Sequence, residues 1–185
     1  THISARVPDK PDTFLLNPYG FLFEEITASC LVKVDEDGNE LDQSDNGINP
    51  AGFTIHSAVH AARSDINFVI HTHTAAGTGV AVQRDGILPL TQHSRVVIAQ
   101  TGYHDYEGIA TDLDERERLA RALDDKRVLV LRNHGLLKCR PGSHCCQLHN
   151  SGEVYEYEID SRPAICITFG IIFRAAYRSE EHTSE

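Results

Sequence analysis

Two histidines lie at the end of a segment that is typical of a buried strand. The segment "INFVIHTH", residues 66–73, is rich in apolar and β-branched residues and ends with His71 and His73. Successive side chains of a strand point to opposite faces of its sheet, so residues two positions apart share a face. The two imidazoles therefore project to one side, as two ligands of one metal ion would.

A third histidine, His134, follows a second apolar segment, "RVLVLRN", and is followed in turn by Gly135. A glycine there permits a tight or left-handed turn, which can tip the imidazole back over the sheet edge. Three imidazoles from two strand ends form the open site of a catalytic zinc ion, with one position available for water or substrate. Zinc suits this ligand set best, and manganese, iron, cobalt and nickel are alternatives.

The other histidines are weaker candidates for metal ligands. A single histidine at a strand end is more often a hydrogen-bonded boundary residue than a ligand, so the metal hypothesis depends on all three positions together. The remaining candidates are interpreted one by one as satisfied polar residues, and His2 is the weakest of them. These residues are His2, His56, His60, His93 and His104.

The composition excludes several classes of protein. A chain of 185 residues with 41% hydrophobic and 24% charged residues is typical of one ordinary globular domain. Its net charge of -10 argues against nucleic acid or an anionic membrane as the main partner. The sequence shows no apolar run of about 20 residues and no secretory leader, so we expect a cytoplasmic protein without a membrane span. The five cysteines include no Cys-x-x-Cys pair.

Strand and helix patterns alternate along the chain, which predicts the α/β class. We expect hairpins at residues 2–17 and 30–41, and strands at 67–73, 87–90 and 127–131. We expect helices at residues 54–63, 75–83 and 113–125, and a loop at 101–112. Thr54 is the expected N-cap of the first helix, and the last should bury Leu113, Leu119, Ala120 and Leu123.

Several motifs together resemble one family. They are "GFTIHSAVHAARSDINFVIHTHTAAG", "GYHDYEGIATD", "VLVLRNHGLL" and the first 35 residues. From residue 1 to about residue 138 the chain is similar to the class II aldolase and adducin family, above all to the adducin head domain and bacterial adducin-like proteins. The resemblance implies a three-layer α/β/α domain around a mostly antiparallel central sheet, and a helix before the first residue.

The resemblance also implies a metal site and a departure from the family's chemistry. Fuculose-phosphate and rhamnulose-phosphate aldolases hold zinc at the positions that match His71, His73 and His134. Their acid/base glutamate stands nineteen residues before the first of these histidines, where this chain has Gly52. Their phosphate-binding serines and Gly-Asn pair are replaced as well, by Pro50, Ala51, Thr1 and His2.

Two functions follow as alternatives. The first is a zinc-dependent lyase that acts on a small hydroxycarbonyl compound, with His104 and Tyr106 as candidates for proton transfer. The alternative for residues 103–107 is a structural loop with hydrogen-bonded aromatics, and we favour it. The second function is a non-catalytic adducin-like head that associates with the spectrin and actin skeleton. The histidine triple favours the first and Gly52 the second.

The resemblance further implies a cyclic homotetramer in which residues 103–108 help to complete a neighbour's site. We also expect the chain to be a fragment, because it begins at Thr1 and contains no methionine. Residues 139–185 do not show the long amphipathic helix that should follow "NHGLL". A one-nucleotide shift can convert residues 142–158 into a helix-like string, and "RSEEHTSE" resembles translated sequencing adapter. We therefore interpret residues 1–138 as the domain and 139–185 as a frameshifted tail.

Overall fold

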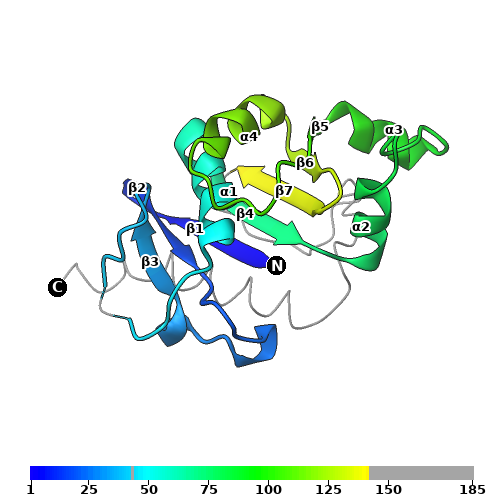
Figure 1. Ribbon diagram of the computed structural model, residues 1–185. Coiled ribbons are helices and arrows are strands. Elements are labelled where there is room, and N and C mark those ends of the chain that lie inside the picture. Colours follow the sequence, from blue (N-terminus) through cyan, green and yellow to red (C-terminus); the bar gives the residue numbers. More distant parts are fainter. Residues whose placement is uncertain (43, 142–185) are drawn as a thin grey trace, which may run out of the picture.

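The computed structural model describes residues 1–42 and 44–141, which form one seven-stranded sheet flanked by helices (Figure 1). The strands are β1 (His2–Val7), β2 (Lys10–Leu16), β3 (Val32–Asp35), β4 (Ile66–Thr72), β5 (Thr101–His104), β6 (Val128–Leu131) and β7 (Gly135–Pro141). The helices are α1 (Pro50–Ala62), α2 (Ala75–Ala81), α3 (Gln92–Ala99) and α4 (Glu115–Leu123). Two single-turn 3₁₀ helices, Phe23–Glu25 and Ala28–Cys30, lie between β2 and β3. The α/β class is confirmed.

The strand order is β3-β2-β1-β4-β7-β6-β5. The pair β5 and β6 is parallel, and the other neighbouring pairs are antiparallel. The sheet is therefore mixed: it is antiparallel for the most part, as expected, and contains one parallel pair at its edge. Helix α4 makes the parallel pair possible, because parallel neighbours need a crossover connection and α4 lies between β5 and β6 in the chain.

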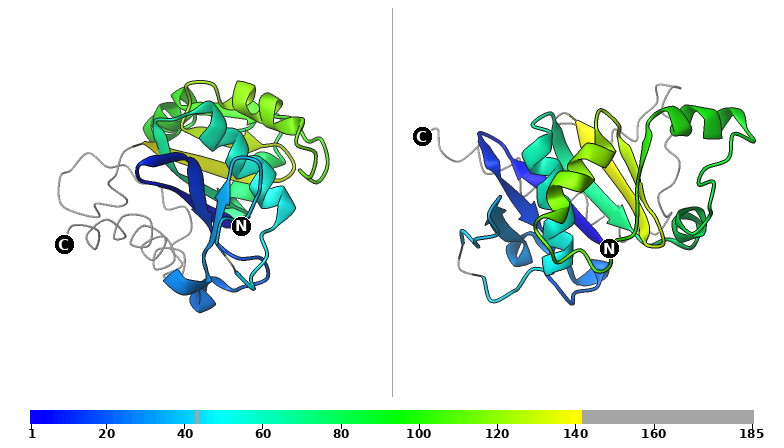
Figure 2. Two further views of the ribbon diagram at one scale, coloured as in Figure 1. Left: turned by 90° about the vertical axis from the view of Figure 1, so that its left-hand side faces the viewer. Right: turned by 45° about the horizontal axis from the view of Figure 1, so that its top comes forward.

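Helices lie on both faces of the sheet (Figure 2). On one face, α1 and α4 pack against each other and enclose a core with alternate residues of the central strands. Its members include Ile55, Val59, Val69, Leu119, Leu123, Leu129, Leu131 and Leu137. On the other face, α2 packs against β7, where Gly77 lies close to the Leu136 side chain. The central strands that end beside the candidate site are thus fixed from both sides.

Both predicted hairpins are present, but the strands of the second pair over a much shorter stretch than those of the first. Strands β1 and β2 form a regular antiparallel pair, with Asp9 in the left-handed region at φ 56° in their turn. The second turn contains Gly38 at φ 89°, as an Asp-Gly turn requires. After that turn the chain makes one isolated bridge, between Val34 and Glu40, so the second hairpin is short.

Some element boundaries differ from the sequence-based expectation. Helix α1 begins at Pro50, and its N-cap is Asn49 and not Thr54, which lies inside the helix. No strand forms at residues 87–90. The next element after α2 is helix α3, which begins at Gln92. Strand β5 occupies the start of the expected loop at 101–112. Leu113 precedes α4 and is 46% exposed, so it does not join the buried face of that helix.

Strand β7 continues to Pro141, three residues beyond the predicted domain boundary, and pairs with β4 along this stretch. The expectation for residues 142–185 lies outside the described residues. Within residues 1–42 and 44–141, no helix combines the length and apolar character needed to cross a membrane.

Candidate metal centre

The end of β4 delivers His71 and His73 to one place. His71 is 1% exposed and stands opposite Leu137 of the neighbouring strand β7. His73 follows immediately after the strand and is exposed. Both imidazoles project to one side, as the alternation of a strand requires.

The turn between β6 and β7 brings His134 to the same place. Its left-handed residue is Asn133, at φ 57°, and not Gly135 as the sequence suggested. Asparagine adopts this conformation more readily than most residues. Gly135 has a different role, because a Cβ atom there would lie 2.5 Å from the carbonyl oxygen of Thr72. The glycine lets β7 approach β4 closely, which sets His134 beside the end of β4.

The three imidazoles converge. The ring centroids of His71 and His73 are 4.6 Å apart, those of His71 and His134 4.8 Å, and those of His73 and His134 4.7 Å. One potential ligand atom from each ring lies within 4.8 Å of the others. The Nε2 atoms of His71 and His73 are 2.7 Å apart. The arrangement brings together all three predicted ligands.

A hydrogen bond fixes the orientation of His71. Its Nδ1 atom lies 3.1 Å from the carbonyl oxygen of Leu136. A carbonyl oxygen only accepts, so Nδ1 carries the proton and Nε2 presents its lone pair toward His73 and His134. Metal-ligating histidines are held in this way by a partner on the other ring nitrogen. The donor set therefore fits a divalent transition metal.

The environment keeps these rings neutral, which is the form that binds metals. Burial, followed by the proximity of His134 and His73, lowers the pKa of His71 well below its usual value. Burial and then His73 lower the pKa of His134 to about 4. Burial also lowers the pKa of His73. Near neutral pH all three imidazoles have lone pairs to share.

Gly52 lies in the first turn of α1, and the space next to it is filled by the ring of His2. A Cβ atom on Gly52 would lie 2.9 Å from three atoms of that ring. The His2 ring in turn stacks on His71, with centroids 5.9 Å apart and planes 13° from parallel. The family resemblance implies that Gly52 lies at the rim of the metal pocket, and the His2 ring connects it to His71. A larger side chain at position 52 would need the place of the His2 ring, so Gly52→Glu should disturb this packing.

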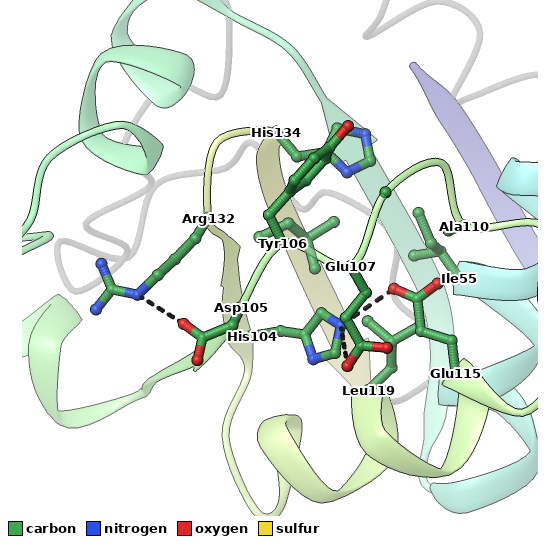
Figure 3. A pocket seen from close by; sticks show the side chains of 12 residues that line it. Ile55, His104, Asp105, Tyr106, Glu107, Ala110, Glu115, Leu119, Arg132 and His134 are labelled. Carbon is green, nitrogen blue, oxygen red and sulfur yellow. Dashed lines mark hydrogen bonds and ion pairs between the residues drawn. The ribbon is translucent and has the colours of Figure 1, made fainter.

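The two candidates for proton transfer occupy different environments (Figure 3). His104 is buried at the end of β5, and its Nε2 atom lies 3.1 Å from Glu115 Oε1 and 3.8 Å from Glu107 Oε1. Glu107 also accepts three hydrogen bonds from Arg118. His104 is thus bound within a network of its own. Tyr106 is 55% exposed and lines one pocket together with His134.

Two further histidines converge, contrary to their one-by-one interpretation. The hydroxyl of Ser4 lies 2.6 Å from His56 Nδ1 and 2.8 Å from His60 Nε2, and all three residues are buried. Arg6 donates to the carbonyl oxygen of His60 at 2.7 Å. These contacts join β1 to α1. Sequence spacing shows that His56 and His60 share a helix face, but it does not reveal the serine of a distant strand.

Comparison with known proteins agrees with this fold. The family described as "Class II Aldolase and Adducin N-terminal domain" matches residues 1–142. The chain therefore belongs to the class II aldolase and adducin family.

Individual relatives come from both branches of the family. The chain is 59% identical over 137 residues to a Caulobacter vibrioides protein whose name assigns it to aldolase class 2. It is 42% identical over 139 residues to alpha-adducin of Rattus norvegicus. These matches cover 74% of this chain, and 53% and 19% of the two relatives. The chain thus spans about half the length of its bacterial relative.

Solved structures share the fold. An aldolase II superfamily protein from Pseudomonas syringae is 57% identical, with a TM-score of 0.72 over 75% of this chain and 56% of that one. An L-fuculose 1-phosphate aldolase from Glaciozyma antarctica is 29% identical, with a TM-score of 0.65 over 75% of this chain and 53% of that one.

Proposed function

We propose that this chain forms the metal-binding domain of a lyase that acts on a small hydroxycarbonyl compound. His71, His73 and His134 would hold a divalent transition metal, with zinc as the first choice for three imidazoles. The observation that carries the proposal is the convergence of these rings around the Nε2 atom of His71, which the Leu136 carbonyl holds in place. Similarity to an L-fuculose 1-phosphate aldolase supports it.

The residues around the triad have distinct roles in this proposal. A metal ion would supply a Lewis acid that polarises a carbonyl oxygen. His71 is buried and forms the floor of the site, while His73 and His134 are reachable from solvent. Tyr106 lines the pocket beside His134 and offers a phenol for proton transfer. His104, bonded to Glu115, holds the segment before Tyr106 in place and is the weaker candidate.

The segment that carries Tyr106 also supports assembly into an oligomer. Large apolar and aromatic side chains are exposed along it, namely Tyr106 at 55%, Ile109 at 77% and Leu113 at 46%. Exposed groups of this kind mark interaction surfaces. We propose a cytoplasmic homotetramer in which this segment reaches a neighbouring subunit, as the family resemblance implies.

A second function is favoured by Gly52 and by the similarity to alpha-adducin. Without a carboxylate at position 52, the proton abstraction expected of the sugar-phosphate aldolases has no evident base there. In this alternative the domain is a non-catalytic module for protein association, for example with a spectrin and actin skeleton, and the metal stabilises its fold.

A retro-aldol screen separates the two functions. The purified protein is incubated with a panel of hydroxyaldehydes, hydroxyketones and their phosphates, before and after treatment with a chelator. The lyase proposal predicts cleavage that the chelator abolishes and that added zinc restores. A metal-loaded protein that cleaves nothing in the panel would favour the association module.

A further inference from the structure

Helix α2 connects the two chain segments that carry His73 and His134. It begins directly after His73 with its N-cap Thr74, whose hydroxyl oxygen accepts a backbone hydrogen bond of the helix at 3.0 Å. It ends at Ala81, whose carbonyl oxygen accepts a hydrogen bond from the backbone N–H of Asn133 at 3.0 Å. Asn133 immediately precedes His134. Two of the three candidate ligands are thus attached to opposite ends of one helix.

The sequence of α2 does not make it a stable helix by itself. It has seven residues, and Gly77 and Gly79 both disfavour the helix relative to alanine. Gly77 is needed where the helix approaches β7, because a Cβ atom there would lie 3.0 Å from the Leu136 side chain. A Cβ atom at Gly79 would meet no atom of the described residues within 4 Å. The helix therefore depends on contacts with β7 and at its two ends.

Arg132 supplies contacts at the second end. It belongs to the turn between β6 and β7, and its Nη1 atom donates to the carbonyl oxygens of Gln83 at 3.2 Å and Arg84 at 3.1 Å, just after α2. Its guanidinium lies over the ring of Tyr103, 4.8 Å from the ring centre. Its Nε atom lies 3.4 Å from Asp105 Oδ1. One side chain thus joins the end of α2 to β5 and to the turn that carries the third ligand.

Tyr103 holds the same segment by further contacts. Its hydroxyl oxygen accepts a hydrogen bond from the backbone N–H of Ile87 at 3.1 Å. Gly86 adopts φ 63°, and a Cβ atom there would lie 2.5 Å from the Tyr103 ring. Residues 83–87 are therefore packed closely against the tyrosine on which Arg132 lies.

We propose that Arg132 is a positioning residue of the metal centre, which fixes His134 relative to His73 through α2. Its side chain points toward Asp105 and away from His134, so it acts through the backbone and not as a ligand (Figure 3). With this arginine in place, the end of α2 and the turn before β7 form one rigid unit. The inference rests on the proposed function, since it needs the metal centre.

Zinc affinity tests this role. Arg132→Gln removes the stacked charge and weakens the two carbonyl contacts, so the zinc dissociation constant should rise about tenfold, as it does for other residues that orient ligands. Competition with a chromophoric chelator measures it. The visible spectrum of the cobalt-loaded protein should change as well, because it reports coordination geometry. Arg84→Gln is the matched control: it removes an exposed charge from the same segment and should keep the wild-type values.

A second substitution tests whether α2 transmits the effect. Gly79→Ala favours the helix and meets no described neighbour, so in the Arg132→Gln background it should recover several-fold of the lost zinc affinity. In the wild-type background it should leave zinc affinity unchanged. Arg132→Gln protein whose affinity does not recover with Gly79→Ala would overturn the role of α2 and with it the proposal.

The outcomes separate this inference from the proposed function. An Arg132→Gln protein with a lower melting temperature but unchanged zinc affinity and cobalt spectrum would overturn the inference and leave the metal centre intact. If that variant does not fold, Tyr103→Phe removes only the hydroxyl that holds Ile87 and should weaken zinc binding in the same direction; unchanged binding would again overturn the inference. A wild-type protein that binds no zinc would overturn the proposed function together with this inference.

Discussion

At the scale of single residues, the hydroxyl of Ser4 holds two histidines of α1 in fixed orientations. A serine has one proton to donate, so it donates to one ring and accepts from the other. Both rings are then fixed tautomers inside the protein. The network places α1, and with it Gly52, against the strand that carries His2.

Ser4→Ala should lower the free energy of unfolding by about 1–3 kcal/mol, because two buried ring nitrogens lose their partner. Urea denaturation followed by circular dichroism measures this change. Ser29→Ala is the matched control, because Ser29 is exposed and its hydroxyl bonds another exposed residue. Equal stability of the Ser4→Ala protein would show that the two rings do not depend on this hydroxyl.

His60 should make stability depend on pH. Burial, and then the charge of Arg6, lower its pKa from 6.5 to about 3. Below pH 6.5 the unfolded chain binds a proton that the folded chain does not, so stability falls as the pH drops toward 3. Between pH 6 and 4 this residue should contribute a slope of about 1.4 kcal/mol per pH unit.

The His60→Gln variant tests this pH dependence, since glutamine keeps a polar group near the position of Nε2 and does not titrate. Its free energy of unfolding, measured between pH 4 and 6, should depend less steeply on pH than that of the wild type. The two slopes should differ by about 1.4 kcal/mol per pH unit, the contribution of one proton. Identical slopes in the two proteins would contradict a neutral His60 in the folded state.

At the scale of elements, the start of α1 determines where Gly52 lies. The side chain of Asn49 accepts hydrogen bonds from the backbone N–H groups of Ala51 at 3.0 Å and Gly52 at 3.5 Å. Pro50 occupies the first helical position, where its missing N–H group costs nothing. Cap and proline together fix the turn that faces His2.

Asn49→Ala should reduce the free energy of unfolding by about 1 kcal/mol, the usual effect of losing an N-cap. Asn49→Asp keeps an acceptor at the same position, and its carboxylate favours a helix N-terminus, so it should match or exceed the wild type. Thermal denaturation of the three proteins gives the order. A helix that starts at Thr54 would leave all three equally stable.

The sequence predicted the elements whose buried residues recur at a regular spacing along the chain. Strand β4 and helix α4 have apolar residues at the spacing of their structure, and both formed within a few residues of the expected bounds. Helix α3 was missed because it has no buried residue and hence no apolar stripe, although Thr91 is its N-cap. Strand β5 was missed because four residues with a glycine give no alternation.

The candidate site was predictable where it depends on local spacing. His71 and His73 are two apart on one strand, and His134 follows another strand, so the sequence alone suggested all three. His2 could not be ranked in this way, because its position follows from the pairing of β1 with β4, 69 residues away. The signal that was available was Gly52, whose missing side chain leaves room for another residue.

At the scale of the whole molecule, the exposed apolar side chains of residues 106–113 should be covered by another subunit. Light scattering should give about four times the mass of one chain. Ile109→Glu should reduce that mass, because Ile109 is 77% exposed and a charge there opposes burial. Leu22→Glu is the control at an exposed site away from this segment, and equal dissociation of both variants would contradict an interface at Ile109.

The origin of residues 142–185 is a question about the gene, because residues 139–141 belong to β7. We propose that a single-nucleotide shift replaced the family's next helix and that the final residues are translated adapter. The family match ends at residue 142, which is compatible with this proposal. A second, independent read of the same gene should therefore diverge from the present sequence near β7. A read that reproduces residues 142–185 in frame, followed by a stop codon, would contradict it.

The metal content of the purified protein tests the central claim most directly. Mass spectrometry of the wild type after zinc loading and desalting should find one zinc ion per chain. His71→Ala, His73→Ala and His134→Ala should each lose stoichiometric zinc, because two imidazoles hold the ion far more weakly than three. His93→Ala, at an exposed position of α3, should keep it. Full zinc content in the His134→Ala protein would contradict the metal centre described above.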